Sequence, residues 1–366
     1  MSKQVISTSQ LTLFVASFLV SGLGLSLIKT MIANAGNDTW LTFFPPMLYG
    51  MLVALFIIWL SRNAVEPTLF ELNKTLLGNV GGSVLNLLLF VYVLLTISMD
   101  LRELSEFVKA ILLYRTPLYV IVISILILTV YLVRSGIEVL GRVNQIYFIA
   151  TLMIYVLMPV MLLNEIDLTN LRPPFGNNAG KLFSSSYNAL GLYGELLIVF
   201  AITFSFTPKR EPGKINPLFR GILLGTFLAT WLMVTLLVSI GSSMGSEGMY
   251  PDLFMVQMIH ITDFLDRLDI VMAAISIPTI IMKVCLGYYA LCECASSIGK
   301  GGTQSRAFGF VLMPLVYLFT VFSFGNVIDQ LNFESHVWSL LTLIFQLPVV
   351  VLLVLAKWMK GRSSNC

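Results

Sequence analysis

Long apolar segments recur along the whole chain and are separated by short polar connections. Each is at least about as long as the 20 residues that a helix needs to cross the ~30 Å hydrocarbon core of a bilayer. They lack the alternating pattern of barrel strands, and lipid cannot satisfy open backbone groups, so helices are expected. The pattern predicts an all-α integral membrane protein with ten transmembrane helices. These are expected at residues 11–32, 40–60, 84–113, 117–134, 143–163, 187–207, 218–241, 268–296, 307–324 and 336–358.

Composition and charge support this assignment and give it an orientation. Hydrophobic residues make up 57% of the chain and charged residues only 11%, against roughly 25% charged residues in soluble domains. Basic residues concentrate in cytoplasmic loops of membrane proteins, and an N-terminus inside puts thirteen here on the cytoplasmic side against three outside. The cytoplasmic set is Lys3, Arg62, Lys74, Arg134, Arg142, Lys209, Arg210, Lys214, Lys300, Arg306, Lys357, Lys360 and Arg362, and the outer set is Arg115, Arg172 and Lys181. Both termini are therefore predicted to be cytoplasmic, and the net charge of +3 requires no nucleic-acid partner.

The loop at 164–186 divides the predicted spans into two groups of five. It is the largest external loop and is rich in Pro, Gly and Asn, a turn-forming composition. Because each group holds an odd number of spans, the second group enters the membrane in the opposite direction to the first. We predict two inverted five-helix repeats, 1–163 and 187–366, the second ending in a short cytoplasmic tail.

The first span of each group carries residues that weaken a helix at membrane depth. Glycine lets a helix unwind, and the freed backbone groups are tolerated only around a protected polar cavity. Interrupted helices at corresponding positions indicate the binding site of an inverted-repeat transporter. Their ends offer N–H groups to a carboxylate and carbonyls to a cation, and an amino acid carries both charges. We predict that both helices are broken; the alternative is that these glycines only allow close helix packing. The residues concerned are Ser21, Gly22 and Gly24 in the first span, and Gly191, Tyr193, Gly194 and Glu195 in the sixth.

Two further spans place polar side chains at membrane depth. Tyr92 and Thr96 share one face of the third span, whereas Ser276, Thr279 and Lys283 align at i, i+3 and i+7 in the eighth. These residues are predicted to complete the substrate-binding site. An ionisable residue inside a membrane is a functional candidate whose partner must be named. For Lys283 the partners considered are carbonyls near Ser21–Gly24 or the Glu195 carboxylate, and a purely structural ion pair is the alternative.

Catalytic and cofactor-binding motifs are not evident. His260 and His336 lie near external span ends, and Gly299–Gly302 lacks the spacing of a phosphate-binding loop. The Cys292–Cys294 pair has no further ligands that would indicate a metal, so we expect it to be structural. The sequence predicts a protein that is not an enzyme and that has no metal or cofactor.

Several short motifs resemble those of one family of membrane proteins. The chain resembles the B subunits of bacterial spore germinant receptors, the spore germination permease family within the amino acid–polyamine–organocation superfamily. The resemblance covers nearly the whole chain. The motifs are Ala35-Gly36-Asn37-Asp38-Thr39-Trp40-Leu41, Arg102 with Glu106, Leu112-Leu113-Tyr114-Arg115-Thr116-Pro117, Leu171-Arg172-Pro173, Gly194-Glu195 and Asp266-Arg267.

The resemblance implies a fold, a role and partners. The fold is a pair of inverted five-helix repeats, and the role is sensing a germinant in the spore inner membrane, in complex with a larger A-type membrane subunit and a C-type lipoprotein. The germinant is expected beside the broken first and sixth helices, with contributions from the third and eighth. On this sequence, that implies Gly22, Gly24, Tyr92, Thr96, Gly194, Glu195 and the region from Thr279 to Lys283.

Two functions follow as hypotheses. The first is a receptor subunit that binds a small germinant, expected to be an amino acid, and signals to partner subunits. The second is an amino acid transporter coupled to protons or sodium, with Glu195 as a candidate proton carrier. They share a pocket and differ in whether the substrate crosses the membrane.

Overall fold

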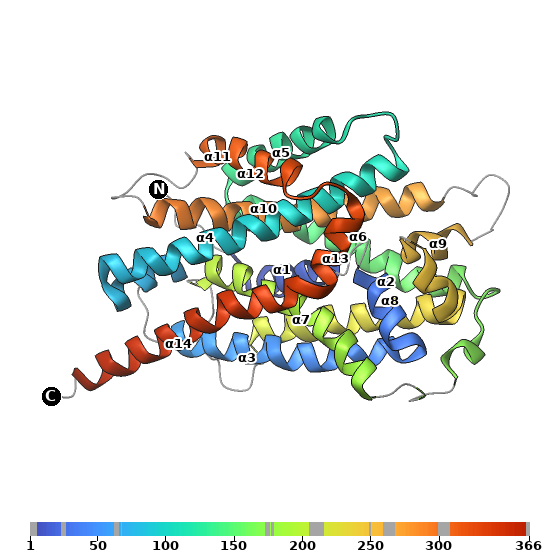
Figure 1. Cartoon of the computed structure of the whole chain (residues 1–366), viewed down its shortest axis with the longest axis horizontal. Coiled ribbons are helices and arrows are strands. Elements are labelled where there is room, and N and C mark those ends of the chain that lie inside the picture. Colours follow the sequence, from blue (N-terminus) through green and yellow to red (C-terminus); the bar gives the residue numbers. More distant parts are fainter. Residues whose placement is uncertain are drawn as a thin grey trace.

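The computed structural model describes residues 6–22, 27–61, 66, 68–172, 176, 179–204, 216–248, 250–258, 268–298 and 308–363, and the regular structure within them is helical throughout (Figure 1). The first half contains α1 (Thr8–Gly22), α2 (Leu27–Ala35), the 3-10 helix η1 (Gly36–Phe43), α3 (Phe44–Ser61), α4 (Leu69–Ile111), α5 (Leu118–Ser135), α6 (Ile137–Met161) and the 3-10 helix η2 (Leu168–Leu171). The second half contains α7 (Ala179–Ile202), α8 (Pro217–Glu247), α9 (Pro251–Gln257), α10 (Leu268–Ile298), α11 (Phe308–Val311), α12 (Met313–Phe322), α13 (Val327–Phe333), the π-helix η5 (Glu334–Trp338) and α14 (Ser339–Ser363).

Eight helical segments of the described chain are long and apolar enough to cross a membrane, and the protein is an integral membrane protein. Two shorter apolar helices, Thr8–Gly22 and Phe308–Phe322, fall at the first and ninth predicted spans. Helices thus occur at every predicted span. The count of ten crossings and the inverted repeats stay predictions.

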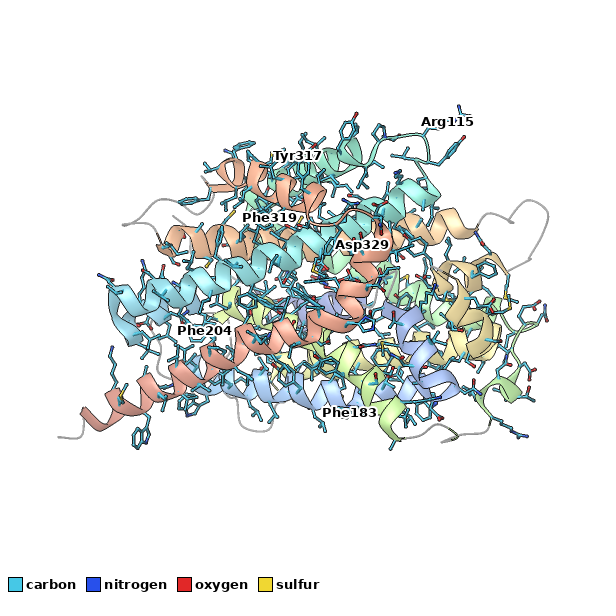
Figure 2. All side chains as sticks on the ribbon, in the orientation of Figure 1. Arg115, Phe183, Phe204, Tyr317, Phe319 and Asp329 are labelled. Atoms are coloured by element: carbon cyan, nitrogen blue, oxygen red, sulfur yellow. The ribbon has the colours of Figure 1, made fainter. Side chains whose placement is uncertain are left out.

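The helices form a bundle with a buried centre and an apolar rim. In α7, 89% of the most apolar window is buried, against 22% in α6, so α7 is central and α6 faces the surroundings. Figure 2 shows Phe319 and Tyr317 at the outer face of α12 and Phe183 at the edge of α7. Phe204, just after α7, is buried. Apolar side chains exposed around the rim are consistent with a lipid environment, because lipid tails are apolar and provide no hydrophobic driving force to bury them.

Two long helices bend sharply at glycines with left-handed backbone angles. Gly78 has φ 76° within α4, and Gly241 has φ 72° within α8, conformations that other residues rarely adopt. At Gly78 the chain folds back, so that Asn73 donates to Asn86 Oδ1 at 2.7 Å and Asn86 donates to the Phe70 carbonyl at 2.8 Å. The bend explains why α4 is longer than one membrane crossing requires.

Contacts between helix ends agree with the predicted alternation of spans. Thr12 near the start of α1 donates to the Pro217 carbonyl at the start of α8. At the end of α14, Lys357 donates to the Trp59 carbonyl near the end of α3. Each contact joins ends that the distribution of basic residues assigns to the cytoplasmic side.

The predicted break in the sixth span is wrong. Residues Ala179–Ile202 form one continuous helix that includes Gly191, Gly194 and Glu195. These glycines instead allow close packing against α14 and the π-helix, because a Cβ at Gly194 would overlap Thr342 and one at Gly191 would lie 2.9 Å from Trp338. The packing interpretation of the glycines is therefore correct for this helix. In the first span, α1 ends at Gly22 and α2 begins at Leu27, and Gly24 lies outside the described residues.

Candidate binding site

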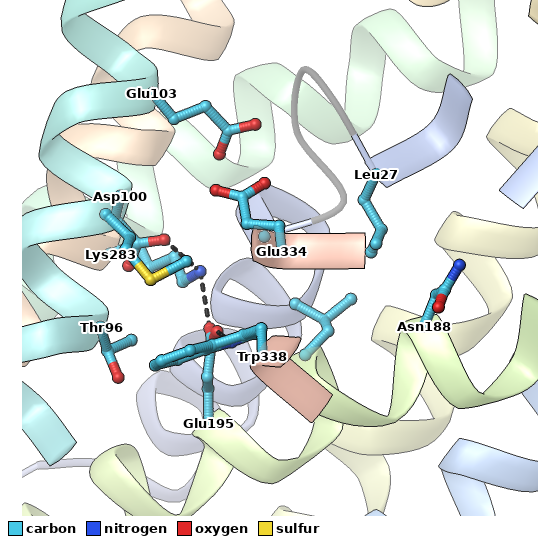
Figure 3. Close-up of a pocket in the computed structure, with 12 residues that line it drawn as sticks. Leu27, Thr96, Asp100, Glu103, Asn188, Glu195, Lys283, Glu334 and Trp338 are labelled. Atoms are coloured by element: carbon cyan, nitrogen blue, oxygen red, sulfur yellow. Dashed lines mark hydrogen bonds and ion pairs between the residues drawn. The ribbon is translucent and has the colours of Figure 1, made fainter. Parts of the chain in front are cut away.

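A small polar cavity lies at membrane depth between α1, α2, α4, α7, α10 and the π-helix (Figure 3). Its volume is about 40 Å³, which is room for a few water molecules. An amino acid or a larger ligand would enter only if the lining side chains moved. The cavity is therefore too small for such a ligand in this conformation.

A buried ion-pair cluster forms one wall of the cavity. The Lys283 ammonium on α10 lies 2.7 Å from Asp100 Oδ1 on α4 and 2.8 Å from Glu195 Oε2 on α7. The three side chains are only 3%, 12% and 7% exposed. Burying a charge away from water is costly, so a buried charge needs a close partner of opposite sign. Here one ammonium contacts two carboxylates. The cluster therefore ties three helices together at the site.

The π-helix contributes side chains to the lining of the cavity. Trp338 donates from its indole Nε1 to Glu195 Oε1 at 2.7 Å, and its ring lies across Glu195 in Figure 3. Tyr92 stacks on the same indole with ring centroids 5.8 Å apart. π-helical segments occur often at functional sites, because the extra residue per turn redirects side chains. In this helix the segment spans Glu334 to Trp338, and both of these side chains line the cavity.

Four of the predicted site residues line this cavity. Gly22, Thr96, Glu195 and Lys283 meet there, although they come from four helices. A Cβ at Gly22 would lie 3.0 Å from the Lys283 ammonium, so the glycine lets the charge approach the end of α1. Glu195 is one of the partners that the sequence suggested for Lys283, and the two side chains are in contact here. Tyr92 lies behind Trp338, where its hydroxyl accepts from Gln346 at 3.4 Å.

Three predicted residues line a second cavity instead. Ser21, Ser276 and Thr279 face a space of about 30 Å³ between α1, α6, α8, α9 and α10. There the Thr279 and Thr151 hydroxyls lie 2.9 Å apart. Ser276, Thr279 and Lys283 share one helix face, but the first two line the second cavity and Lys283 lines the main one.

The other residues predicted for α7 face helix contacts. Tyr193 shares a hydrogen bond of 2.7 Å with the Thr226 hydroxyl on α8 and does not line the main cavity. Gly191 donates its amide to the Ser339 hydroxyl at 3.2 Å, and the Gly194 carbonyl accepts from Gln346. Gly191 and Gly194 thus face α14 and Tyr193 faces α8, and none of the three lines the main cavity.

Sequence reasoning missed four polar or aromatic residues of the main cavity: Asp100, Asn188, Glu334 and Trp338. Glu103, which also lines it, shares the helix stripe of Tyr92 and Thr96 that the sequence indicates as a candidate cavity lining. Asp100 could have been found, since it lies four residues after Thr96 and one turn further along the same helix face. The π-helix that turns Glu334 and Trp338 inward has no sequence signal that we recognise.

Asp252 gives the second cavity a pH-dependent side chain. Burial raises the pKa of the Asp252 carboxyl from 3.8 to about 6, although the amides of Leu253 and Asp252 donate to it. The folded protein keeps this proton to higher pH than the unfolded chain does. Stability should therefore fall as pH rises from about 4 to about 6 and remain lower above that range.

We expect Asp252→Asn to remove this penalty. At pH 7.5 the variant should melt at a higher temperature than the wild type in detergent, and near pH 4 the two should coincide. The control is Asp167→Asn, an exposed residue whose carboxyl has a lowered pKa because Thr169 donates to it. A wild-type melting temperature that rises between pH 4 and 6, or an Asp252→Asn variant that melts lower at pH 7.5, would contradict the assignment.

The overall fold matches that of solved transporters. A nucleobase-cation-symport-1 family transporter, solved in a closed conformation with bromovinylhydantoin bound, superposes with a TM-score of 0.66 at 13% identity. The match covers 89% of this chain and 74% of that chain. The chain therefore has the fold of this transporter, and its buried polar site lies between the helices of that fold.

Family membership is shown by the sequence. Residues 5–327 match the family described as spore germination protein, and the chain belongs to that family. Spore germination protein KB of Bacillus subtilis (strain 168) is 27% identical over 376 residues, covering 100% of this chain and 98% of that protein. Spore germination protein YndE of the same organism is 22% identical over 363 residues and covers 97% of both chains.

Proposed function

We propose that the protein is the nutrient-sensing subunit of a spore germinant receptor. It binds a small germinant, an amino acid, at membrane depth and signals to partner subunits that trigger germination. The observation that carries the proposal is the small buried cavity at which Lys283 contacts Asp100 and Glu195, and Trp338 donates to Glu195. Membership of the spore germination protein family supplies the biological context.

The site suggests how occupancy becomes a signal. A germinant larger than a few water molecules must displace the Trp338 side chain or replace one of the contacts within the Lys283 cluster. Because that cluster joins α4, α7 and α10, either change alters the packing between these helices. A ligand shifts a conformational equilibrium only if it binds one state more tightly, and here the open arrangement is the one that has room for it.

The proposed architecture is that of two inverted repeats of five transmembrane helices, 1–163 and 187–366, linked by the external loop 164–186. Helices at each predicted span and the transporter fold support it. The proposal places both termini in the cytoplasm and the protein in the spore inner membrane. The partners are an A-type membrane subunit and a C-type lipoprotein, as the family resemblance implies.

Transport is the alternative function, and the fold favours it. A solved structure that superposes on the chain is that of a nucleobase-cation-symport-1 family transporter. Purified protein in lipid vesicles separates the two functions. A receptor binds its germinant without moving it, whereas uptake of radiolabelled germinant that depends on a proton or sodium gradient would replace the receptor proposal with the transporter.

Thr96 offers a test of the site that leaves folding unchanged. Its side chain lines the cavity, and its hydroxyl donates to the Tyr92 carbonyl of its own helix at 2.9 Å, so removing the hydroxyl breaks none of the described hydrogen bonds between helices. We expect Thr96→Leu to narrow the cavity and to raise the germinant concentration for half-maximal germination by about tenfold or more, with unchanged abundance on an immunoblot.

Thr96→Ser is the matched control, because it keeps the hydroxyl and adds no volume. It should germinate like the wild type. A normal response from Thr96→Leu at normal abundance would show that the germinant binds elsewhere.

A further inference from the structure

The main cavity has a half-buried end and a fully buried end. Glu103 and Glu334, which line one end, are half-buried. Thr96 and Glu195, which line the other end, are only 1% and 5% exposed. Figure 3 shows Glu103 and Glu334 above the Lys283 ammonium, and Thr96 and Glu195 below it. Solvent therefore approaches the cavity from the end at Glu103 and Glu334.

The direction of the helices assigns this half-buried end to the external side. With both termini in the cytoplasm and alternating spans, as proposed above, α4 runs outward and α14 runs inward. Glu103 follows Thr96 along α4, so it lies further out. Glu334 precedes Trp338 in the π-helix that leads into α14, so it also lies further out. Two helices of opposite direction therefore agree on the orientation of the cavity.

A layer of buried side chains lies at the cytoplasmic end of the cavity. Phe18 on α1, Tyr92 on α4 and Gln346 on α14 are 1%, 0% and 1% exposed. Each lies one or two helical turns nearer the cytoplasm than the cavity-lining residue of its own helix or, for Gln346, of the preceding π-helix. The centroid of the Phe18 ring is 5.3 Å from the Lys283 ammonium. These three side chains, called the inner layer below, lie between the cavity and the cytoplasmic half of the bundle.

Gln346 holds the inner layer together because it bonds to three neighbouring helices. Its amide nitrogen donates to the Gly194 carbonyl on α7 and, at 3.4 Å, to the Tyr92 hydroxyl on α4. Its amide oxygen accepts from the Tyr49 hydroxyl on α3. A buried amide is costly unless its groups are hydrogen-bonded. The positions of α3, α4 and α7 around α14 are therefore set by this one side chain.

The inner layer also contacts the wall that a germinant must displace. Tyr92 stacks on Trp338 with ring centroids 5.8 Å apart, and Trp338 donates to Glu195 in the cavity. A germinant that moves the Trp338 side chain therefore acts directly on Tyr92. Gln346 bonds to Tyr92 from the other side and opposes its displacement.

We propose that Gln346 is a positioning residue that holds an inner barrier beneath the germinant cavity. The germinant enters from the external side, and the barrier keeps it from passing into the cytoplasm, so that binding produces a signal and not transport. The inference rests on the proposed function, because it takes the main cavity as the germinant site.

The side from which the cavity can be reached is measured with a cysteine at Thr96. Thr96→Cys is combined with Cys366→Ser in the full-length protein, which leaves the buried thiols of Cys285, Cys292 and Cys294. Right-side-out and inverted membrane vesicles are treated with a membrane-impermeant methanethiosulfonate. We expect the new thiol to react at least about tenfold faster from the external side, because a minor inward-open state is populated at only about 0.1–10%.

Variants of the inner layer test the role of Gln346. In the Thr96→Cys protein, Gln346→Ala and Tyr49→Phe should each raise labelling from the cytoplasmic side several-fold. Tyr49→Phe removes a single hydroxyl, so a folding defect in Gln346→Ala does not remove the test. Thr226→Val is the control, because it removes a buried hydrogen bond of 2.7 Å to Tyr193, between α7 and α8 and away from the main cavity. It should leave the labelling one-sided.

The outcomes separate this inference from the proposed function. Equal labelling of Thr96→Cys from both sides would overturn the inner barrier, and variants that label like the intact network would overturn the role of Gln346. Neither result would affect a germinant response that Thr96→Leu weakens. A germinant whose binding is insensitive to Thr96→Leu would overturn the proposed site, although one-sided labelling would still support the barrier. Gradient-driven uptake of the germinant by the wild type would overturn both the receptor function and the barrier.

Discussion

Replacing Lys283 by methionine is expected to destabilise the protein strongly and to abolish the germinant response. The substitution leaves Asp100 and Glu195 buried beside each other without the ammonium that both contact. Removing one partner of a buried ion pair costs about 3–5 kcal/mol, because the remaining charge has no compensation. A melting temperature in detergent and an immunoblot of spore membranes measure the loss.

The design includes a rescue. Lys283→Met combined with Asp100→Asn and Glu195→Gln removes all three charges and should recover most of the stability, since neutral replacements of buried ion pairs are often tolerated. The response should stay absent, because the cluster that joins the three helices is gone. Lys29→Met is the control, since Lys29 contacts only a carbonyl in an exposed position among the described contacts. A Lys283→Met variant that melts like the wild type would show that the cluster contributes nothing to stability.

The helices could be predicted well from sequence because the bilayer restricts the possibilities. Apolar length specifies a span, and helices of the described chain lie at each predicted position, including α5 (Leu118–Ser135), predicted at 117–134. The third span is predicted at 84–113, and α4 begins earlier, at Leu69, because Gly78 turns the chain back on itself.

The site could be predicted only in part. Glu195 and Lys283 were identified because ionisable residues at membrane depth are costly and few, and they form an ion pair. Asp100 was not selected, since it belongs to the charged second part of the third span and sequence does not show which charges there turn inward. Trp338 was missed because it lies on a π-helix, and the extra residue in that turn sets the direction of its side chain.

The glycines of α7 show the limit most clearly. Interruption and close packing both require glycine, and the sequence does not distinguish between them. In the structure, packing accounts for Gly194, because Thr342 lies where its Cβ would be. The correction changes the expected effect of a substitution there from loss of binding to loss of folding.

We therefore expect Gly194→Val to remove most folded protein from the membrane. Its branched side chain would overlap Thr342 Cγ2 and crowd Gln346, which lies 3.1 Å from the Cβ position, and α14 would have to move away from α7. Overpacking of this kind costs about 1–3 kcal/mol or more. Gly180→Val is the control on the same helix, because no atom lies within 4 Å of its Cβ position.

The smaller Gly194→Ala variant makes the cause testable. It should lose part of the stability, and adding Thr342→Ser should restore much of it, because serine lacks the methyl group that overlaps the new Cβ. Fluorescence-detected gel filtration and melting temperatures measure both effects. If the segment were unwound, the Gly194→Ala variant would have normal stability and would fail to bind the germinant. Adding Thr342→Ser would then not restore binding. The contact between α7 and α14 thus distinguishes the two roles of glycine that the sequence leaves open.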